Sequence, residues 1–164
     1  LEKTHPPHNA APAQYPPDFA TLPTAKGAIL HTTAGDIEWA FYRREAPQTV
    51  KNFVRLAEKG YFDGLFVHRV VPNFVIQDGD PTGTGSGGPG YTIRCEYNRL
   101  RYDRYQVGMA LSGKDTGGSQ WFITHSPQPH LNGKYTIFAR VVRGQDVVWK
   151  IVQGDQVTKV QILK

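Results

Sequence analysis

Apolar and polar residues alternate along much of the chain, with the period of two that is typical of strands with one buried face. In 28–42, two such runs flank the turn residues 34–36, and Ile37, Trp39 and Phe41 share one face of the second run. This pattern predicts a hairpin. Further strands are expected in 66–71, 74–76, 92–97, 106–111, 119–126, 135–142 and 158–163.

Two segments instead follow the period of an amphipathic helix, about 3.6 residues per turn. In the segment 46–62, the residues that form one apolar stripe are Val50, Phe53, Val54 and Ala57. The segment 144–153 is expected to bury Val147, Val148 and Ile151 in the same way. We therefore predict one helix in each segment.

The order of these elements predicts the fold class. Consecutive strands are connected by turns, which favours an antiparallel sheet, and about eight strands without edge protection favour closure into a barrel. We expect a mainly β fold, a closed barrel of about eight antiparallel strands capped by two α-helices, in one domain over 25–164. Residues 1–24 hold six of the twelve prolines and are expected to be a Pro-rich linker or tail.

The stretch 66–91 combines a cation, two apolar runs and a glycine-rich loop. Arg69 lies inside the first run, where alternation places it on one face with Val67 and Val71, and Val75 and Gln77 share a face of the second run. An arginine buried among aliphatic side chains is costly unless it is paired. Two explanations follow: a carboxylate elsewhere in the chain pairs with Arg69, or the arginine lines a cleft where a ligand accepts its hydrogen bonds.

The glycine-rich loop 79–90 contains six glycines. A phosphate-binding loop would be followed by a Lys-Ser/Thr pair and a helix, whereas this loop leads into the strand-like segment 92–97. We therefore interpret the glycines as permitting positive φ angles and close chain crossing at the edge of a site.

Composition and charge exclude few function classes. The chain is 39% hydrophobic and 20% charged, as in soluble globular domains, and no apolar run approaches the roughly 20 residues of a membrane helix. It begins with Leu, which suggests a fragment or a processed product, so the sequence does not decide whether a targeting signal has been removed. Because Cys95 is the single cysteine and the histidines lack further ligands, no disulfide and no metal are expected.

The net charge of +5 raises the question of a nucleic-acid partner. The one basic and aromatic cluster combines Arg99, Arg101 and Arg104 with Tyr97, Tyr102 and Tyr105. A solvated loop whose arginines lie over tyrosine rings is favoured over a nucleic-acid site. We expect neither a nucleic-acid nor a membrane partner.

Several segments together resemble the cyclophilin family of peptidyl-prolyl cis-trans isomerases, in particular its bacterial members. They are FVHRVVPNFVIQDGDPTGTGSGGPGY at 66–91, GMA at 108–110, GSQWFIT at 118–124 and HLNGKYTIFARVV at 130–142. The resemblance covers essentially 27–163 and implies the same capped barrel as the strand pattern. It further implies an enzyme that rotates X-Pro bonds in proline-containing peptides or unfolded proteins, assists folding, acts as a monomer and needs no cofactor.

The resemblance also implies roles for single positions. Arg69 is similar to the catalytic arginine, and Gln77 to the residue that hydrogen-bonds the substrate backbone; Phe74 completes the catalytic set. The residues of the implied proline pocket are Phe74, Val75, Phe122 and Leu131. Those of the implied substrate groove and its far rim are Ala110, Gln120, Leu111, His130 and Tyr135.

These residue types suit the reaction. Rotation about an X-Pro bond breaks amide resonance, across a barrier of about 18–20 kcal/mol. The twisted state needs a hydrogen-bond donor to the prolyl nitrogen and a dry pocket. Arginine supplies a permanent charge and a rigid fork of donors. No metal, nucleotide or titrating base is required.

Three positions depart from well-known members of the family. Animal members usually carry tryptophan at His130, a position associated with tight cyclosporin binding, and histidine at Tyr135, so the resemblance implies weakened cyclosporin affinity. Leu111 replaces a polar residue, which implies altered contacts to the substrate residue before proline.

Two other functions compete with the isomerase. A proline-peptide binding module would keep the groove without turnover, but such a module would be expected to lose Arg69. A small-ligand barrel of the lipocalin type would need a hollow interior, whereas the motifs suit a packed barrel with an external groove.

Overall fold

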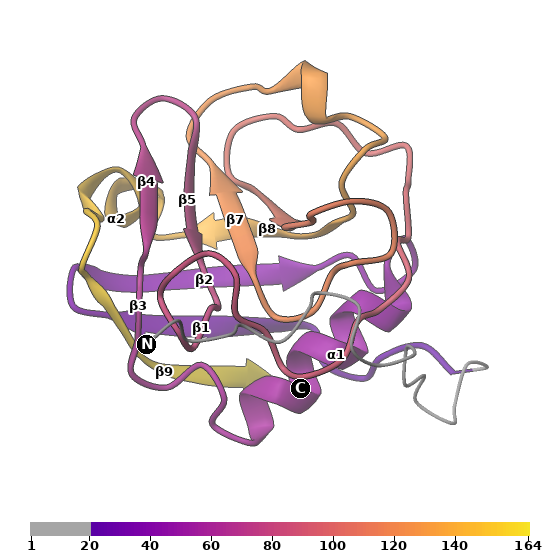
Figure 1. The fold of residues 1–164 in the computed structure, drawn as a ribbon, viewed down its shortest axis with the longest axis horizontal. Coiled ribbons are helices and arrows are strands. Elements are labelled where there is room, and N and C mark those ends of the chain that lie inside the picture. The colour runs from indigo at the N-terminus through magenta and orange to yellow at the C-terminus, as the bar shows by residue number, and fades with distance from the viewer. Residues whose placement is uncertain (1–20) are drawn as a thin grey trace, which may run out of the picture.

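The computed structural model describes residues 21–164, so most of the tail expected at 1–24 lies outside the described residues. The strands are β1 (Gly27–Thr32), β2 (Gly35–Phe41), β3 (Leu65–Phe66), β4 (Arg69–Val71), β5 (Val75–Asp78), β6 (Gln106–Met109), β7 (Trp121–Thr124), β8 (Ile137–Arg143) and β9 (Gln156–Leu163). The helices are α1 (Pro47–Glu58), α2 (Gln145–Lys150) and the short 3-10 helix η1 (Pro129–Leu131). The mainly β class is thereby confirmed (Figure 1).

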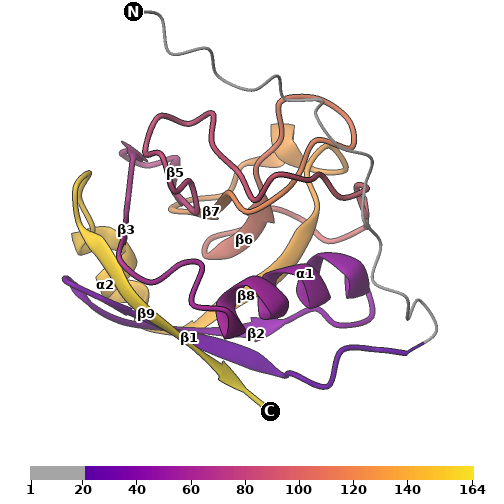
Figure 2. The same ribbon diagram turned by 60° about the horizontal axis from the view of Figure 1, so that its bottom comes forward.

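All nine strands belong to one antiparallel sheet, in the order β3-β9-β1-β2-β8-β6-β7-β5-β4. The sheet curls so that β1, β2 and β9 form one wall and β5, β6 and β7 face them (Figures 1 and 2). The helices α1 and α2 lie on opposite sides of this curled sheet (Figure 1). The expected closed barrel of eight strands is wrong, because the outer strands β3 and β4 are not hydrogen-bonded to each other.

The sheet stays open because the run 66–71, which was expected to be one strand, is interrupted. The Val67 amide donates to Asp155 O at 2.8 Å, and Val67 O accepts from the Gly154 amide at 2.9 Å. After His68 the chain pairs with β5 instead. The two outer strands are therefore consecutive pieces of chain, separated only by Val67 and His68.

The hairpin and both helices are confirmed. In β2, Ile37, Trp39 and Phe41 are all buried, as their alternation predicts. In α1 the buried stripe contains Leu56 where Val54 was expected, because Val54 is only half-buried. The helix α2 ends at Lys150 and buries Val147 and Val148, and Ile151 is buried just beyond it.

The segment 92–97, expected to be a strand, forms only an isolated bridge between Ile93 and Gly117. Its backbone amides bond to side chains instead: the Cys95 amide to Asp115 Oδ1 at 2.9 Å and the Glu96 amide to Thr136 Oγ1 at 2.9 Å. The Glu96 carboxylate in turn accepts the Gln48 and Thr49 amides at the start of α1, at 3.1 and 2.6 Å. The segment thus ties α1 to the sheet.

Within residues 21–164, no helix is long and apolar enough to cross a membrane. The same part of the chain contains no group of three or more His, Cys, Asp or Glu side chains that could hold a metal ion.

Candidate functional site

A second apolar cluster lies apart from the main core and contains most of the predicted site residues. We call it the pocket cluster; its buried members are Val75, Tyr102, Phe122, Leu131 and Ile137, and its half-buried members are Tyr42, Phe74, Leu100, Ala110 and Tyr135. The cluster therefore brings together all four residues implied for the proline pocket, and two of those implied for the groove.

Strand register explains how Phe122 reaches the centre of the pocket cluster. In β7 it lies opposite Gln77 of β5 on one side and Gly108 of β6 on the other. A Cβ atom at Gly108 would be 2.2 Å from Tyr102 Oη and 2.4 Å from Phe122 Cζ. The glycine therefore makes room for these two rings, which stack with their centroids 5.4 Å apart.

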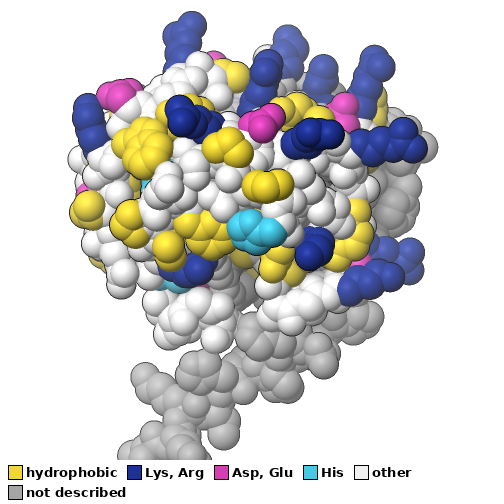
Figure 3. All heavy atoms as spheres, turned by 90° about the horizontal axis from the view of Figure 1, so that it is seen from above, with side chains coloured by type: hydrophobic (Ala, Val, Ile, Leu, Met, Phe, Trp, Pro, Cys, Tyr) yellow, Lys and Arg dark blue, Asp and Glu magenta, His cyan; other side chains and the backbone are white. Residues whose placement is uncertain are grey.

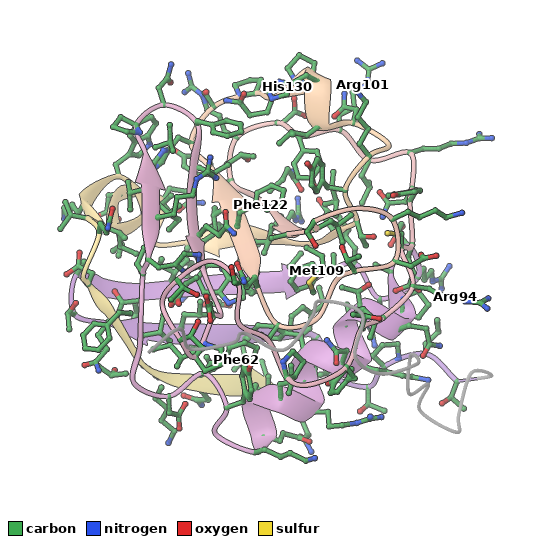
Figure 4. The ribbon with its side chains drawn as sticks, in the orientation of Figure 1. Phe62, Arg94, Arg101, Met109, Phe122 and His130 are labelled. Atoms are coloured by element: carbon green, nitrogen blue, oxygen red, sulfur yellow. The ribbon has the colours of Figure 1, made fainter. Side chains whose placement is uncertain are left out.

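Two further predicted site residues contact aromatic rings of the pocket cluster, and one of them, His130, lies at the top of the view in Figure 4. His130, on η1, is exposed and stacks on Phe74 with ring centroids 5.7 Å apart. Tyr135 packs edge-on against Phe122 at 5.9 Å, and its backbone oxygen accepts a hydrogen bond from Tyr102 Oη at 3.1 Å. Both residues thus contact aromatic members of the pocket cluster.

Arg69 is exposed, which corrects the expectation that it is buried among aliphatic side chains. Val67, which was expected on the same face, is buried in the main core, because the strand is interrupted between Val67 and Arg69. Arg69 Nη1 donates to Gln77 Oε1 at 3.1 Å, and its Cζ lies 5.7 Å from the centre of the Phe74 ring. Within residues 21–164 no ion pair includes Arg69, and its side chain is exposed.

The side-chain amides of Gln120 and Gln77, which are hydrogen-bonded to each other, set the orientation of this arginine. Gln120 Nε2 donates to Gly85 O and Gly87 O at 3.0 and 2.9 Å. Its oxygen therefore faces Gln77 and accepts Gln77 Nε2 at 2.9 Å. Because an amide has its donor and acceptor on opposite arms, Gln77 must then present its oxygen to Arg69. The glycine-rich loop thus fixes the polarity of the whole chain of hydrogen bonds.

Asp80 holds the glycine-rich loop in shape. Its Oδ1 accepts the Thr82 amide and Thr82 Oγ1, both at 2.7 Å, and its Oδ2 accepts the amides of Thr84 and Gly85 at 3.1 and 2.6 Å. Burial favours the neutral form of this carboxyl, but the hydrogen bonds outweigh burial, and the pKa of Asp80 is lowered. Amides that could have cradled a phosphate are therefore occupied by the loop's own carboxylate.

Asp78, the last residue of β5, is buried next to this network. Its Oδ1 accepts the Gly79 amide at 2.6 Å. Burial raises the pKa of Asp78 to about 6; the nearby Asp80 charge adds to this effect, and the Gly79 hydrogen bond opposes it.

One predicted site residue does not join the others. Leu111 packs against the main core, and its Cδ2 would lie 3.2 Å from a Cβ atom at Gly117. Conversely, Tyr102 and Leu100 belong to the pocket cluster, although the sequence suggested only a basic and aromatic loop there. The alternation of these two residues with Arg99 and Arg101 is the signal that could have revealed their buried face.

The chain is similar to known proteins over most of its length. The family model described as cyclophilin type peptidyl-prolyl cis-trans isomerase/CLD matches residues 28–164. Peptidyl-prolyl cis-trans isomerase B of Bacillus subtilis is 48% identical over 138 residues, which cover 83% of this chain and 96% of the relative. A peptidyl-prolyl cis-trans isomerase of Synechococcus elongatus is 46% identical, with 83% and 95% covered.

Among solved structures, a cyclophilin type peptidyl-prolyl cis-trans isomerase of Cryptosporidium parvum, crystallised in the presence of the dipeptide Ala-Pro, superposes with a TM-score of 0.79. It is 32% identical, and the match covers 84% of this chain and 99% of that one.

Proposed function

Because the chain belongs to the cyclophilin family and is a peptidyl-prolyl cis-trans isomerase, we propose that Arg69, Gln77, Phe74 and the pocket cluster are the residues that rotate the X-Pro bond. Family membership shows the isomerase activity, and it supports proline-containing peptides as substrates and a role in protein folding as parts of this proposal. The assignment of single residues rests on their arrangement around the pocket cluster.

In this proposal the proline ring enters the pocket cluster and contacts Phe74, Phe122 and Leu131. This second cluster is separate from the core and has a half-buried rim, as expected of a preformed apolar site for a small ring. Its walls keep water away from the amide that is being twisted, so they do not favour the planar, more polar ground state. All these groups come from one chain, so a monomer suffices.

Arg69 supplies the donor for the prolyl nitrogen, whose lone pair becomes available as the amide twists. One of its N–H groups is held by Gln77, and the guanidinium lies beside the Phe74 ring that borders the pocket. The arginine is therefore oriented before substrate binds and needs no reorganisation in the twisted state. The observation that carries the proposal is this guanidinium, which is held by Gln77 beside Phe74 of the apolar pocket cluster and forms no ion pair within residues 21–164.

The substrate residues before proline run past Gln120 and Ala110, whose backbones are joined by a hydrogen bond of 3.0 Å between the Ala110 amide and Gln120 O. The residues after proline leave on the opposite side of the pocket, past His130. Leu111, packed on the core, contributes only to the support of this groove.

The test compares wild type with Arg69→Lys and Arg69→Ala in proline-peptide isomerisation. Lysine keeps the charge but loses the rigid fork that Gln77 holds, so we expect kcat/KM to fall at least about tenfold, and further for alanine. The matched control is Lys159→Ala, which removes an exposed cation from β9, far from the pocket in sheet order. Unchanged kcat/KM in both Arg69 variants, with folding verified by circular dichroism, would contradict the assigned role.

A further inference from the structure

A group of basic side chains borders the pocket cluster on the His130 side. Arg99, Arg101 and Arg104 are exposed, whereas Leu100 and Tyr102 between them face inward and belong to the pocket cluster. The segment 99–104 therefore has its apolar face against the pocket and its arginines in solvent beside it.

Hydrogen bonds fasten this segment to the rim. The Tyr102 amide donates to Asn132 Oδ1 at 2.7 Å, and Tyr102 O accepts the Gln128 amide at 2.7 Å. Both partners flank η1, which carries His130 and Leu131. A fourth exposed cation, Lys134, follows η1, and its amide donates to Leu131 O at 3.1 Å. We call Arg99, Arg101, Arg104 and Lys134 the basic rim.

The side chains of the basic rim form no ion pairs within the described part of the fold. None of the ion pairs among residues 21–164 includes any of these four side chains. The expectation that the arginines lie over tyrosine rings is wrong, since within residues 21–164 no cation–π contact includes any of them. One aspartate, Asp103, lies among three arginines in this segment.

The view from above, onto the end of the molecule where His130 and Arg101 lie, shows the same imbalance. Apolar side chains cover the middle of this face, and Lys and Arg side chains predominate over Asp and Glu around them (Figures 3 and 4). An extended peptide that leaves the pocket on this side would pass unpaired positive charges within a few residues of its proline.

We propose that the basic rim makes this enzyme selective for proline sites followed by acidic residues in the substrate. The inference rests on the proposed function, in which the chain after proline passes His130. Carboxylates at those positions would meet guanidinium groups that have no competing intramolecular partner, and the positive rim would also speed the encounter with such segments.

A nucleic acid is the less favoured partner for the same charges. Single-stranded nucleic acids bind through aromatic platforms together with cations. Here the central tyrosine of the segment, Tyr102, is only 1% exposed and supports the proline pocket, so it offers no face to a base.

The experiment measures kcat/KM by exchange NMR on three peptides that share Ala-Pro and differ only in the two following residues: Glu-Glu, Gln-Gln or Lys-Lys. Each carboxylate near one arginine contributes about threefold at low ionic strength if the charges lie about 6 Å apart in water. We therefore expect the Glu-Glu peptide to be preferred over the Gln-Gln peptide about tenfold, and this preference to vanish in about 1 M salt.

The variant Arg99→Gln/Arg101→Gln should reduce the ratio of Glu-Glu to Gln-Gln rates to below about threefold. The control Lys159→Gln removes a cation from β9 and should leave the ratio unchanged. Because each ratio is taken within one variant, a general loss of activity or folding cancels.

Three outcomes overturn the inference: equal rates for all three peptides, an equal preference for Glu-Glu placed before the proline, or stronger inhibition by single-stranded RNA than by the Glu-Glu peptide. If the Gln-Gln peptide is turned over in any of these cases, the proposed function stands and only the selectivity is refuted. If wild type accelerates no peptide, the proposed function itself has failed.

Discussion

Replacing Asp78 by asparagine should stabilise the protein at neutral pH. The carboxyl is buried at the end of β5, and burial raises its pKa from 3.8 to about 6. One pKa unit corresponds to about 1.4 kcal/mol, so ionised Asp78 reduces the free energy of unfolding by up to about 3 kcal/mol. Asparagine keeps an oxygen for the Gly79 amide, which Asp78 Oδ1 accepts at 2.6 Å, and carries no charge.

The direction with pH follows from the raised pKa. Below pH 3.8 the carboxyl is protonated in both folded and unfolded chains, so its contribution to stability is fully present there. As the pH rises through about 6, the folded protein must ionise a buried group and that contribution is lost. The advantage of Asp78→Asn over wild type should therefore be small near pH 4 and reach about 1–3 kcal/mol above pH 7.

Urea unfolding of wild type and variant between pH 4 and 7.5 gives this difference directly. Comparing the two proteins at each pH removes common contributions, such as that of His68, whose pKa is lowered by burial and by Arg69. Asp146→Asn is the control, since Asp146 is exposed on α2 and its pKa is lowered by the hydrogen bond from Lys150. A difference between Asp78→Asn and wild type that stays flat with pH, or a variant less stable at pH 7.5, would refute the reasoning.

Two further predictions concern the pocket. Gly108→Ala should lower the free energy of unfolding by about 1–3 kcal/mol and raise KM, because the new methyl group displaces the Tyr102 and Phe122 rings. The control in urea unfolding and kinetics is Gly88→Ala, because no atom lies within 4 Å of the added methyl group there. Equal effects of the two substitutions would contradict the packing argument. Calorimetry should show weak cyclosporin binding by wild type and about tenfold tighter binding by His130→Trp, because the larger tryptophan ring adds apolar surface beside Phe74. Nanomolar binding by wild type would contradict this prediction.

Much of the fold could be predicted because the pattern of neighbouring apolar and polar residues indicates most of the strands and both helices. Alternation in β2 places Ile37, Trp39 and Phe41 on the buried face whatever the rest of the chain does. The pocket residues follow similarly, since Phe74 and Val75 lie at one end of β5 and Phe122 lies in the strand paired with it. Short-range patterns suffice where one face of an element is buried.

The remaining features depend on partners far away in the sequence. The break after Val67 arises from hydrogen bonds to Gly154 and Asp155, which no local pattern encodes. The segment 92–97 alternates like a strand, but its amides are taken by Asp115 and Thr136. Side-chain capture of backbone groups competes with pairing and is invisible to periodicity.

The position of β9 has a consequence for how the domain folds. This strand lies between β1 and β3, and its residue Leu163 pairs with Gly27 of β1. During synthesis the β1–β2 hairpin therefore emerges long before its neighbour, with one row of N–H and C=O groups open to pairing with other chains. We expect the domain to assemble late and in a single cooperative step, with the slow loop closure that such distant contacts impose. Completion of the sheet thus depends on β9, which follows the other eight strands in the sequence.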